Sequence, residues 1–240
     1  MAKISAIEWC DSSWSPWRGC TKVSAGCAHC YAERRAKRVG EDFGMIVRSK
    51  TTLGDPLKWK EPRKIFVGHL SDFAHEEVPL AWVDDAWEIM REASQHTYLI
   101  LTKRPHDLAQ LLPEDWGGGW PNVWIGATVE NADNEWRLVA LEEIRAQVKF
   151  VSAEPLLGPL TNLSSFFPSL DWVIVGGESG PNHRHMKPEW AREIRDACIR
   201  NNVAFFFKQQ GGAKKINGIW GGQLLDGKTY RYFPGEFEPR

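Results

Sequence analysis

The chain has no apolar stretch long enough to cross a bilayer and no N-terminal apolar segment that resembles a signal peptide. We therefore expect a cytoplasmic protein that has no membrane partner. Its five cysteines are an odd number, and a reducing cytoplasm keeps thiols free, so we expect no disulfide framework. The formal net charge of -1 argues against a protein that holds nucleic acid mainly through the phosphate backbone, but it leaves room for a local basic groove.

Several catalytic motifs are also missing. The sequence has no P-loop, no dinucleotide-binding G-x-G-x-x-G, no H-E-x-x-H zinc motif and no nucleophile elbow. Phosphoryl transfer and serine or zinc hydrolysis therefore have no support. No internal repeat, low-complexity tract or linker divides the chain, and 240 residues with 42% hydrophobic content predict one domain with a full core.

Three of the five cysteines, Cys20, Cys27 and Cys30, stand on one short glycine-bearing loop. A structural zinc needs four protein ligands, and a cluster of four irons is normally held by four cysteines. Three thiolates therefore predict a cluster with one iron open to a small molecule. The alternative is a closed zinc site completed by Cys10 or His29, but the loop contains only one C-x2-C pair of the kind that zinc sites use.

Short β-rich runs alternate with helix-patterned stretches along the chain. Because continuous apolar runs suit strands buried on both faces, strand followed by helix, repeated, indicates a parallel sheet or barrel. We predict an α/β fold, a partial (β/α) barrel of about six parallel strands over residues 1–210, with a hairpin extension over 211–240 that packs on the same domain around the Asp226–Gly227 turn. The expected strands are 64–69, 97–101, 122–126, 148–151, 172–175 and 203–207, and the expected helices are 31–39, 80–94, 105–112, 132–146 and 188–201.

Polar residues gather directly after each predicted strand. In a barrel of parallel strands these positions converge on one mouth, where ligands bind. A strand end also turns, so any one set is explained equally well as a turn or a helix cap. The sets are His69, Ser71 and Asp72; Thr102, Lys103 and Arg104; Thr128, Glu130 and Asn131; Glu154; Gly176, Gly177, Glu178 and Ser179; and Lys208, Gln209 and Gln210.

The chain has thirteen tryptophans, several times the usual share, and most of them fall in apolar patterns that predict packing. Trp14, Trp17 and Trp59 are the better candidates for a wall that faces a ligand. Basic residues also cluster, at 34–38 and again at 58–64, and solvated helix and loop faces explain these clusters better than a binding groove does.

Seven motifs, spread over nearly the whole chain, resemble those of the phage-associated three-cysteine-motif family, which is related to the radical SAM superfamily. The superfamily's usual loop is C-x3-C-x2-C, whereas six residues separate the first two cysteines here. The motifs are the cysteine loop ending in Cys-Tyr-Ala-Glu at 30–33, Leu-Ser-Asp-Phe-Ala-His at 70–75, Leu-Thr-Lys-Arg-Pro at 101–105, Ala-Thr-Val-Glu-Asn at 127–131, Ser-Ala-Glu-Pro-Leu at 152–156, Gly-Gly-Glu-Ser-Gly at 176–180 and Phe-Phe-Phe-Lys-Gln at 205–209.

The resemblance implies a radical-SAM-like fold and a radical SAM enzyme. Cys20, Cys27 and Cys30 would hold three irons of a 4Fe-4S cluster, and S-adenosylmethionine would bind the fourth through its amino and carboxylate groups. One electron, from a donor such as flavodoxin or ferredoxin, would then cleave the sulfonium to methionine and a 5′-deoxyadenosyl radical that abstracts hydrogen from a substrate. The protein would supply positioning, charge complementarity and exclusion of water and oxygen.

The strand-end residues would then have tasks at the cofactor. Lys103 or Arg104 suits the cofactor carboxylate, because a cation near the cluster offsets a bound anion. Ser71 and Asp72 would accept from the cofactor ammonium group. The other expected cofactor contacts are Glu130 and Asn131 at the ribose, Gly176 and Gly177 at the adenine, and Thr128 and Glu178, and the catalytic candidates are His75, Tyr31 and Lys208.

Three function classes fit the sequence. The first is a radical SAM enzyme acting on nucleic acid or a nucleotide, which is favoured by the phage association of the resembled family and by the aromatic and basic residues near the loop. The second is a radical SAM enzyme acting on a peptide or small metabolite. The third is a non-catalytic zinc or iron-sulfur module in which the barrel serves as a scaffold.

Overall fold

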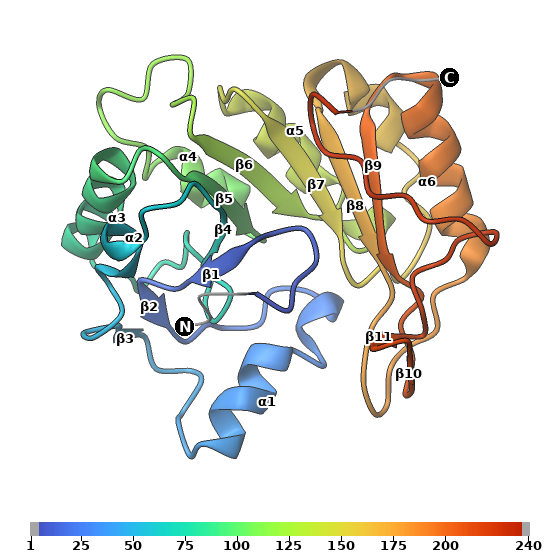
Figure 1. Cartoon of the computed structure of the whole chain (residues 1–240), viewed down its shortest axis with the longest axis horizontal. Helices are drawn as coiled ribbons and strands as arrows, with labels where there is room; N and C mark the ends of the chain where they lie inside the picture. The colour runs from blue at the N-terminus through green and yellow to red at the C-terminus, as the bar shows by residue number, and fades with distance from the viewer. Residues whose placement is uncertain (1–4, 237–240) are drawn as a thin grey trace. The chain divides into compact units, whose positions relative to one another are not determined.

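The computed structural model describes residues 5–236, and Figure 1 shows its elements coloured along the sequence. The chain forms two compact units. Unit 1 comprises Met1–Gly126 and Glu143–Gln147, and unit 2 comprises Ala127–Glu142 and Val148–Arg240. Over residues 5–236, no helix is both long and apolar enough to cross a membrane.

Unit 1 holds the first strands of the main sheet, formed largely by apolar runs. Strand β4 pairs in parallel with β1, where Ser12 lies opposite Ile65, and with β5, where Lys64 lies opposite Thr97. The elements are β1 (Ser12–Trp14), β2 (Trp17–Arg18), η1 (Ala25–Cys27), α1 (Tyr31–Arg38), β3 (Val47–Arg48), α2 (Asp55–Lys58), β4 (Lys64–Val67), α3 (Leu80–Glu92), β5 (Thr97–Thr102), α4 (Pro105–Ala109) and β6 (Val123–Thr128), whose last two residues belong to unit 2.

The tryptophans near the cysteine loop fill the core of unit 1. Trp14 and Trp17 are fully buried, and Trp59 is 9% exposed. The indole N–H of Trp14 donates to the Leu53 carbonyl at 2.9 Å, and that of Trp17 donates to the Asp72 carbonyl at 3.2 Å. The prediction of a ligand-facing tryptophan wall was therefore wrong, because the polar atom of each of these two rings is satisfied by backbone inside the fold.

Unit 2 holds the last strands of the main sheet. Strand β8 pairs in parallel with β7 and β9, and Trp172 stands opposite both Phe150 and Ala204. Helix α6 packs beside β9 (Figure 1). The chain beyond residue 210 returns to β9, where the Phe207 N–H donates to the Tyr230 carbonyl at 2.8 Å. The elements are η2 (Ala132–Asn134), α5 (Trp136–Glu143), β7 (Lys149–Ala153), η3 (Leu163–Ser169), β8 (Trp172–Gly176), α6 (Pro188–Arg200), β9 (Ala204–Gln209), β10 (Lys215–Ile216) and β11 (Ile219–Trp220).

The predicted α/β class is confirmed. The main sheet has seven strands in the order β1-β4-β5-β6-β7-β8-β9, and all six predicted strands are among them. The five predicted helices also form, although the stretch at 132–146 is divided into η2 and α5. Helices α4 and α6 begin at prolines, as the sequence indicated, because the fixed backbone angle of proline suits the first helical turn.

The predicted turn at Asp226 and Gly227 is present. Both residues have positive φ, 53° and 75°, and Leu225 and Lys228 exchange backbone hydrogen bonds of 2.9 and 3.1 Å. These features are typical of a tight two-residue turn. The antiparallel pair β10 and β11 forms a second hairpin, around residues 217–218, which the sequence analysis did not identify.

Candidate functional site

The cysteine loop is fixed at both ends. Gly19, just before Cys20, has φ of 104°, and a Cβ there would lie 2.1 Å from the Met45 carbonyl oxygen, so only glycine fits. The Gly19 N–H donates to the Leu70 carbonyl at 3.1 Å, which ties the loop to the segment after β4. At the other end, Cys30 is the N-cap of α1, so the last cysteine of the loop is held by the start of that helix.

The three loop thiols are the type of ligand that binds an iron-sulfur cluster. Cys20, Cys27 and Cys30 are free and half-buried. Cys10 is fully enclosed, and its thiol donates to the Ile7 carbonyl at 3.6 Å. Over residues 5–236, no three His, Cys, Asp or Glu side chains are placed so that they would hold a metal ion. The ligand types therefore fit the expected group, while the sulfurs are not drawn together in this structure.

A buried guanidinium lies against the loop. The side chain of Arg104 is 6% exposed, and its Nη1 lies 3.7 Å from the Cys20 sulfur and 3.4 Å from the Asp72 carboxylate. Its Nη2 donates to Thr21 twice, to Oγ1 at 2.8 Å and to the carbonyl at 3.3 Å. Burial and the Asp72 charge raise the pKa of the Cys20 thiol to about 11, against the opposing effect of Arg104. Arg104 thus joins the first cysteine of the loop to a buried carboxylate.

Asp72 holds this cation in place. Besides the guanidinium, its carboxylate accepts from Thr102 Oγ1 at 2.5 Å, from the Lys103 N–H at 3.0 Å and from the Ala74 N–H at 3.1 Å. The Arg104 N–H in turn donates to Thr102 Oγ1 at 2.8 Å. The segment after β4 is thereby bonded to the end of β5. Of the strand-end residues that the sequence singled out on these two strands, Asp72, Thr102, Lys103 and Arg104 therefore meet in unit 1.

His75 reaches the loop through the same threonine. It is 1% exposed, its Nε2 lies 2.9 Å from Thr21 Oγ1, and its Nδ1 accepts from the Glu77 N–H at 3.2 Å. Burial and the Arg104 charge lower the pKa of His75, so the ring is neutral at pH 7. A neutral ring that accepts at Nδ1 carries its proton on Nε2, and His75 therefore donates to Thr21.

Ser71 is bonded to the residue that precedes the cysteine loop. Its backbone pairs with Gly19 in an isolated parallel bridge. Its Oγ is shielded from solvent and has no hydrogen-bond partner within residues 5–236. A buried hydroxyl without a protein partner is uncommon, and the Ser71 Oγ can bond a ligand atom or a water.

Tyr31 and His69 form a separate group. The Tyr31 hydroxyl donates to the His69 carbonyl, and the Tyr31 ring is 49% exposed. The His69 Nδ1 lies 2.9 Å from Ser15 Oγ, and burial lowers the pKa of His69 to about 4. The hydroxyl of Tyr31 is therefore engaged with backbone, whereas its ring faces solvent.

In unit 2, Glu130 is paired rather than open. It is fully buried, and it accepts from Arg137 Nη1 at 2.7 Å. The same nitrogen donates to the Thr128 carbonyl at 2.8 Å. Asn131 accepts from Asn134 Nδ2 at 2.6 Å in the turn that begins η2. The polar residues after β6 therefore bond within the protein: Glu130 forms a buried ion pair, and Asn131 forms a turn.

The other charged candidates of unit 2 also have partners. The Glu178 carboxylate is bound by Arg184, whose Nη2 lies 2.5 Å and whose Nε lies 3.1 Å away. Lys208 pairs with Glu154 at 2.9 Å. The roles of these residues at a cofactor stay predictions.

The Gly176–Gly177 pair brings the strand ends of unit 2 close together. A Cβ on Gly176 would lie 2.8 Å from the Glu154 carboxylate, and one on Gly177 would lie 2.0 Å from the Gln210 carbonyl oxygen. Gly177 also exchanges hydrogen bonds with Gln209, through its N–H at 3.0 Å and its carbonyl at 2.9 Å. Gly177 is therefore required for packing against backbone within the protein, whereas Gly176 lies close to a side chain that can move.

The profile of one protein family matches residues 4–234. The chain belongs to the DUF5131 family. The members of that family are described as proteins of unknown function. No curated protein and no solved structure matches the chain.

Sequence reasoning missed some of the residues that complete these groups in this DUF5131 member. Thr21 accepts from both Arg104 and His75, yet it stands among small polar residues that no pattern distinguishes. Arg137 and Arg184 follow their carboxylates by seven and six residues. A glutamate at the end of a buried strand signals that a cation must be near, but it does not say which one.

Proposed function

We propose that this chain is a radical SAM-type iron-sulfur enzyme, of the phage-associated three-cysteine kind that its sequence resembles. Cys20, Cys27 and Cys30 would hold a 4Fe-4S cluster with one iron open to S-adenosylmethionine. When bound, that pair would supply one-electron cleavage of the sulfonium and, with it, hydrogen-atom abstraction from a substrate. We place the protein in the cytoplasm, with flavodoxin or ferredoxin as the electron donor and a nucleic acid or nucleotide as the substrate.

The buried guanidinium of Arg104 beside Cys20 carries this proposal. Three thiolates and a cofactor carboxylate would concentrate negative charge at one place, and a cation held there in advance offsets it. Arg104 is buried, and Asp72 and Thr21 fix its orientation. A pair that only stabilised the fold would not need to contact the cysteine loop.

Neighbouring groups have roles that suit the same ligand. The Ser71 Oγ, which has no partner within residues 5–236, would accept from the cofactor ammonium group. Lys103 directly precedes Arg104 in the sequence and is half-buried. It would be the second cation for the carboxylate of the cofactor. His75 donates to Thr21 and so positions the loop residue that follows Cys20.

Oxygen-free reconstitution tests the proposal. Well-folded protein should turn brown, contain close to four irons per chain by the stoichiometry of the cluster, and change its electron paramagnetic resonance spectrum when S-adenosylmethionine is added. Cys20→Ala, Cys27→Ala and Cys30→Ala should each abolish the cluster. Cys10→Ala and Cys198→Ala are the matched controls, because both remove a buried thiol outside the loop, and both should retain it.

Two results would reject the proposal. One is well-folded protein that binds a single zinc and no iron, which would make the chain a zinc module. The other is loss of the cluster in Cys10→Ala with the fold intact, since the site would then have four cysteines and no open iron.

A further inference from the structure

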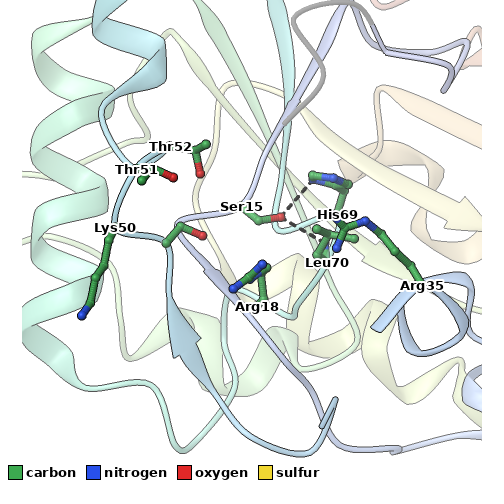
Figure 2. A pocket seen from close by; sticks show the side chains of 9 residues that line it. Ser15, Arg18, Arg35, Lys50, Thr51, Thr52, His69 and Leu70 are labelled. Carbon is green, nitrogen blue, oxygen red and sulfur yellow. Dashed lines mark hydrogen bonds between the residues drawn. The ribbon is translucent and has the colours of Figure 1, made fainter. Parts of the chain in front are cut away.

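Unit 1 contains a polar cavity of about 420 Å³ (Figure 2). Its lining includes Leu70, whose carbonyl accepts the hydrogen bond from Gly19 at the start of the cysteine loop. Its cations come from three separate segments: Arg18 from β2, Arg35 from α1 and Lys50 from the chain after β3. Hydroxyl groups of Ser49, Thr51 and Thr52 line it as well. The function proposed above assigns it no role.

The lining carries excess positive charge. No Asp or Glu is among the residues that line the cavity. Arg18 Nη1 pairs with Glu41 at 2.8 Å, but its Nε is buried and has no hydrogen-bond partner within residues 5–236. Arg35 and Lys50 are exposed and make no ion pair within that same range. The imidazole of His69, also in the lining, is neutral at pH 7 and leaves this charge unchanged.

Cations and hydroxyls that line one cavity without carboxylates are the donors that bind phosphate oxygens. A cavity of this volume holds more than a phosphate ion, since sites for small organic ligands begin near 300 Å³. Three more exposed cations, Arg34, Lys37 and Arg38, lie on α1, the helix that carries Arg35. Phosphate carried on a nucleoside fits both the cavity and these exposed cations.

We propose that the cavity binds the phosphate group of a nucleotide, free or within a nucleic acid strand. This gives the substrate class proposed above a binding site, and it rests on the proposed function only in assigning the bound nucleotide to the substrate. Binding itself needs neither cluster nor S-adenosylmethionine, so its test is independent of the reconstitution experiment.

The test is fluorescence anisotropy of full-length protein with two probes, a short fluorescein-labelled single-stranded oligonucleotide and fluorescein-labelled adenosine monophosphate, at two or more salt concentrations. Adenosine monophosphate, adenosine and inorganic phosphate serve as unlabelled competitors. Arg35→Gln and Lys50→Gln should each weaken binding about ten-fold, the effect of one charge-assisted hydrogen bond, and should lower the salt slope by about one. The control Lys60→Gln removes an exposed lysine of unit 1 that does not line the cavity, and should change affinity less than about two-fold.

The competitors identify the source of the phosphate. Displacement by the monophosphate but not by adenosine supports a phosphate site, and a monophosphate that binds where the oligonucleotide does not assigns it to free nucleotides. The proposal is overturned if neither probe binds, if Arg35→Gln and Lys50→Gln behave like Lys60→Gln, or if adenosine competes as well as its monophosphate. Displacement by S-adenosylmethionine at equal concentration would also overturn it, because the cavity would then belong to the cofactor.

Discussion

Replacing Arg104 by Gln should destabilise the protein strongly. The change leaves the Asp72 carboxylate, 7% exposed, without its cation. Removing one partner of a buried ion pair costs about 3 to 5 kcal/mol. Asp72 keeps its bonds from Thr102, Lys103 and Ala74, so we expect the low end, about 3 kcal/mol. The lost bonds to Thr21 add little, because Thr21 is exposed and water replaces them.

Urea unfolding followed by circular dichroism and tryptophan fluorescence measures this loss. Lys103→Gln is the matched control, because it removes a half-buried cation one residue away, and it should cost less than about 1 kcal/mol. The double variant Asp72→Asn with Arg104→Gln should be more stable than the sum of the single changes predicts, by about 2 kcal/mol, since the isolated charge is gone. A loss below about 1 kcal/mol in Arg104→Gln, or strict additivity in the double variant, would refute the reasoning.

Three further predictions follow from other groups. Either Arg104→Ala or Lys103→Ala should remove the cation at the cofactor carboxylate. That variant should weaken S-adenosylmethionine binding about ten-fold or more in a calorimetric titration of reconstituted protein. If neither variant changes the affinity, both residues lie outside the site. Because the folded pKa of His69 is about 4, below an unfolded value of about 6.5, its stabilisation of up to about 3 kcal/mol is complete above about pH 6.5 and is lost as the pH falls towards 4. Urea unfolding of His69→Asn should therefore depend less on pH across that window than unfolding of the parent protein does, and equal dependence would contradict the assignment. Arg137→Met should cost about 3 to 5 kcal/mol by isolating the buried Glu130, and Glu130→Gln in the same chain should recover part of that loss on thermal unfolding.

Within the main sheet, the sequence predicted the six strands with apolar runs and missed β1, which has none. In β9 the run Ala204–Gln209 begins with buried apolar side chains, which no element other than a buried strand would accommodate at that length. In β1, Ser12 and Ser13 are as buried as core residues, and the Ser12 hydroxyl accepts from Arg63 at 3.1 Å. A pattern of apolar residues cannot find a strand whose burial depends on a distant hydrogen-bond donor.

The same limit applies to the site. That Asp72, Lys103 and Arg104 stand at strand ends follows from local pattern, and their meeting in unit 1 follows from parallel pairing of β4 with β5. That Asp72 would bind Arg104, and that Arg104 would turn towards Cys20, depends on contacts across 32 and 84 positions of the chain. Local propensity carries no information at that range.

The fold determines whether the Thr21 hydroxyl can donate or accept a further hydrogen bond. A hydroxyl has two acceptor sites and one hydrogen to give. Arg104 and His75 both donate to Thr21 Oγ1, so both of its acceptor sites are used from the interior. Its one hydrogen therefore remains to be donated to a group that lies beside Thr21. A molecule that settles there meets a donor, which selects for carboxylate or carbonyl oxygens and against ammonium groups at that spot.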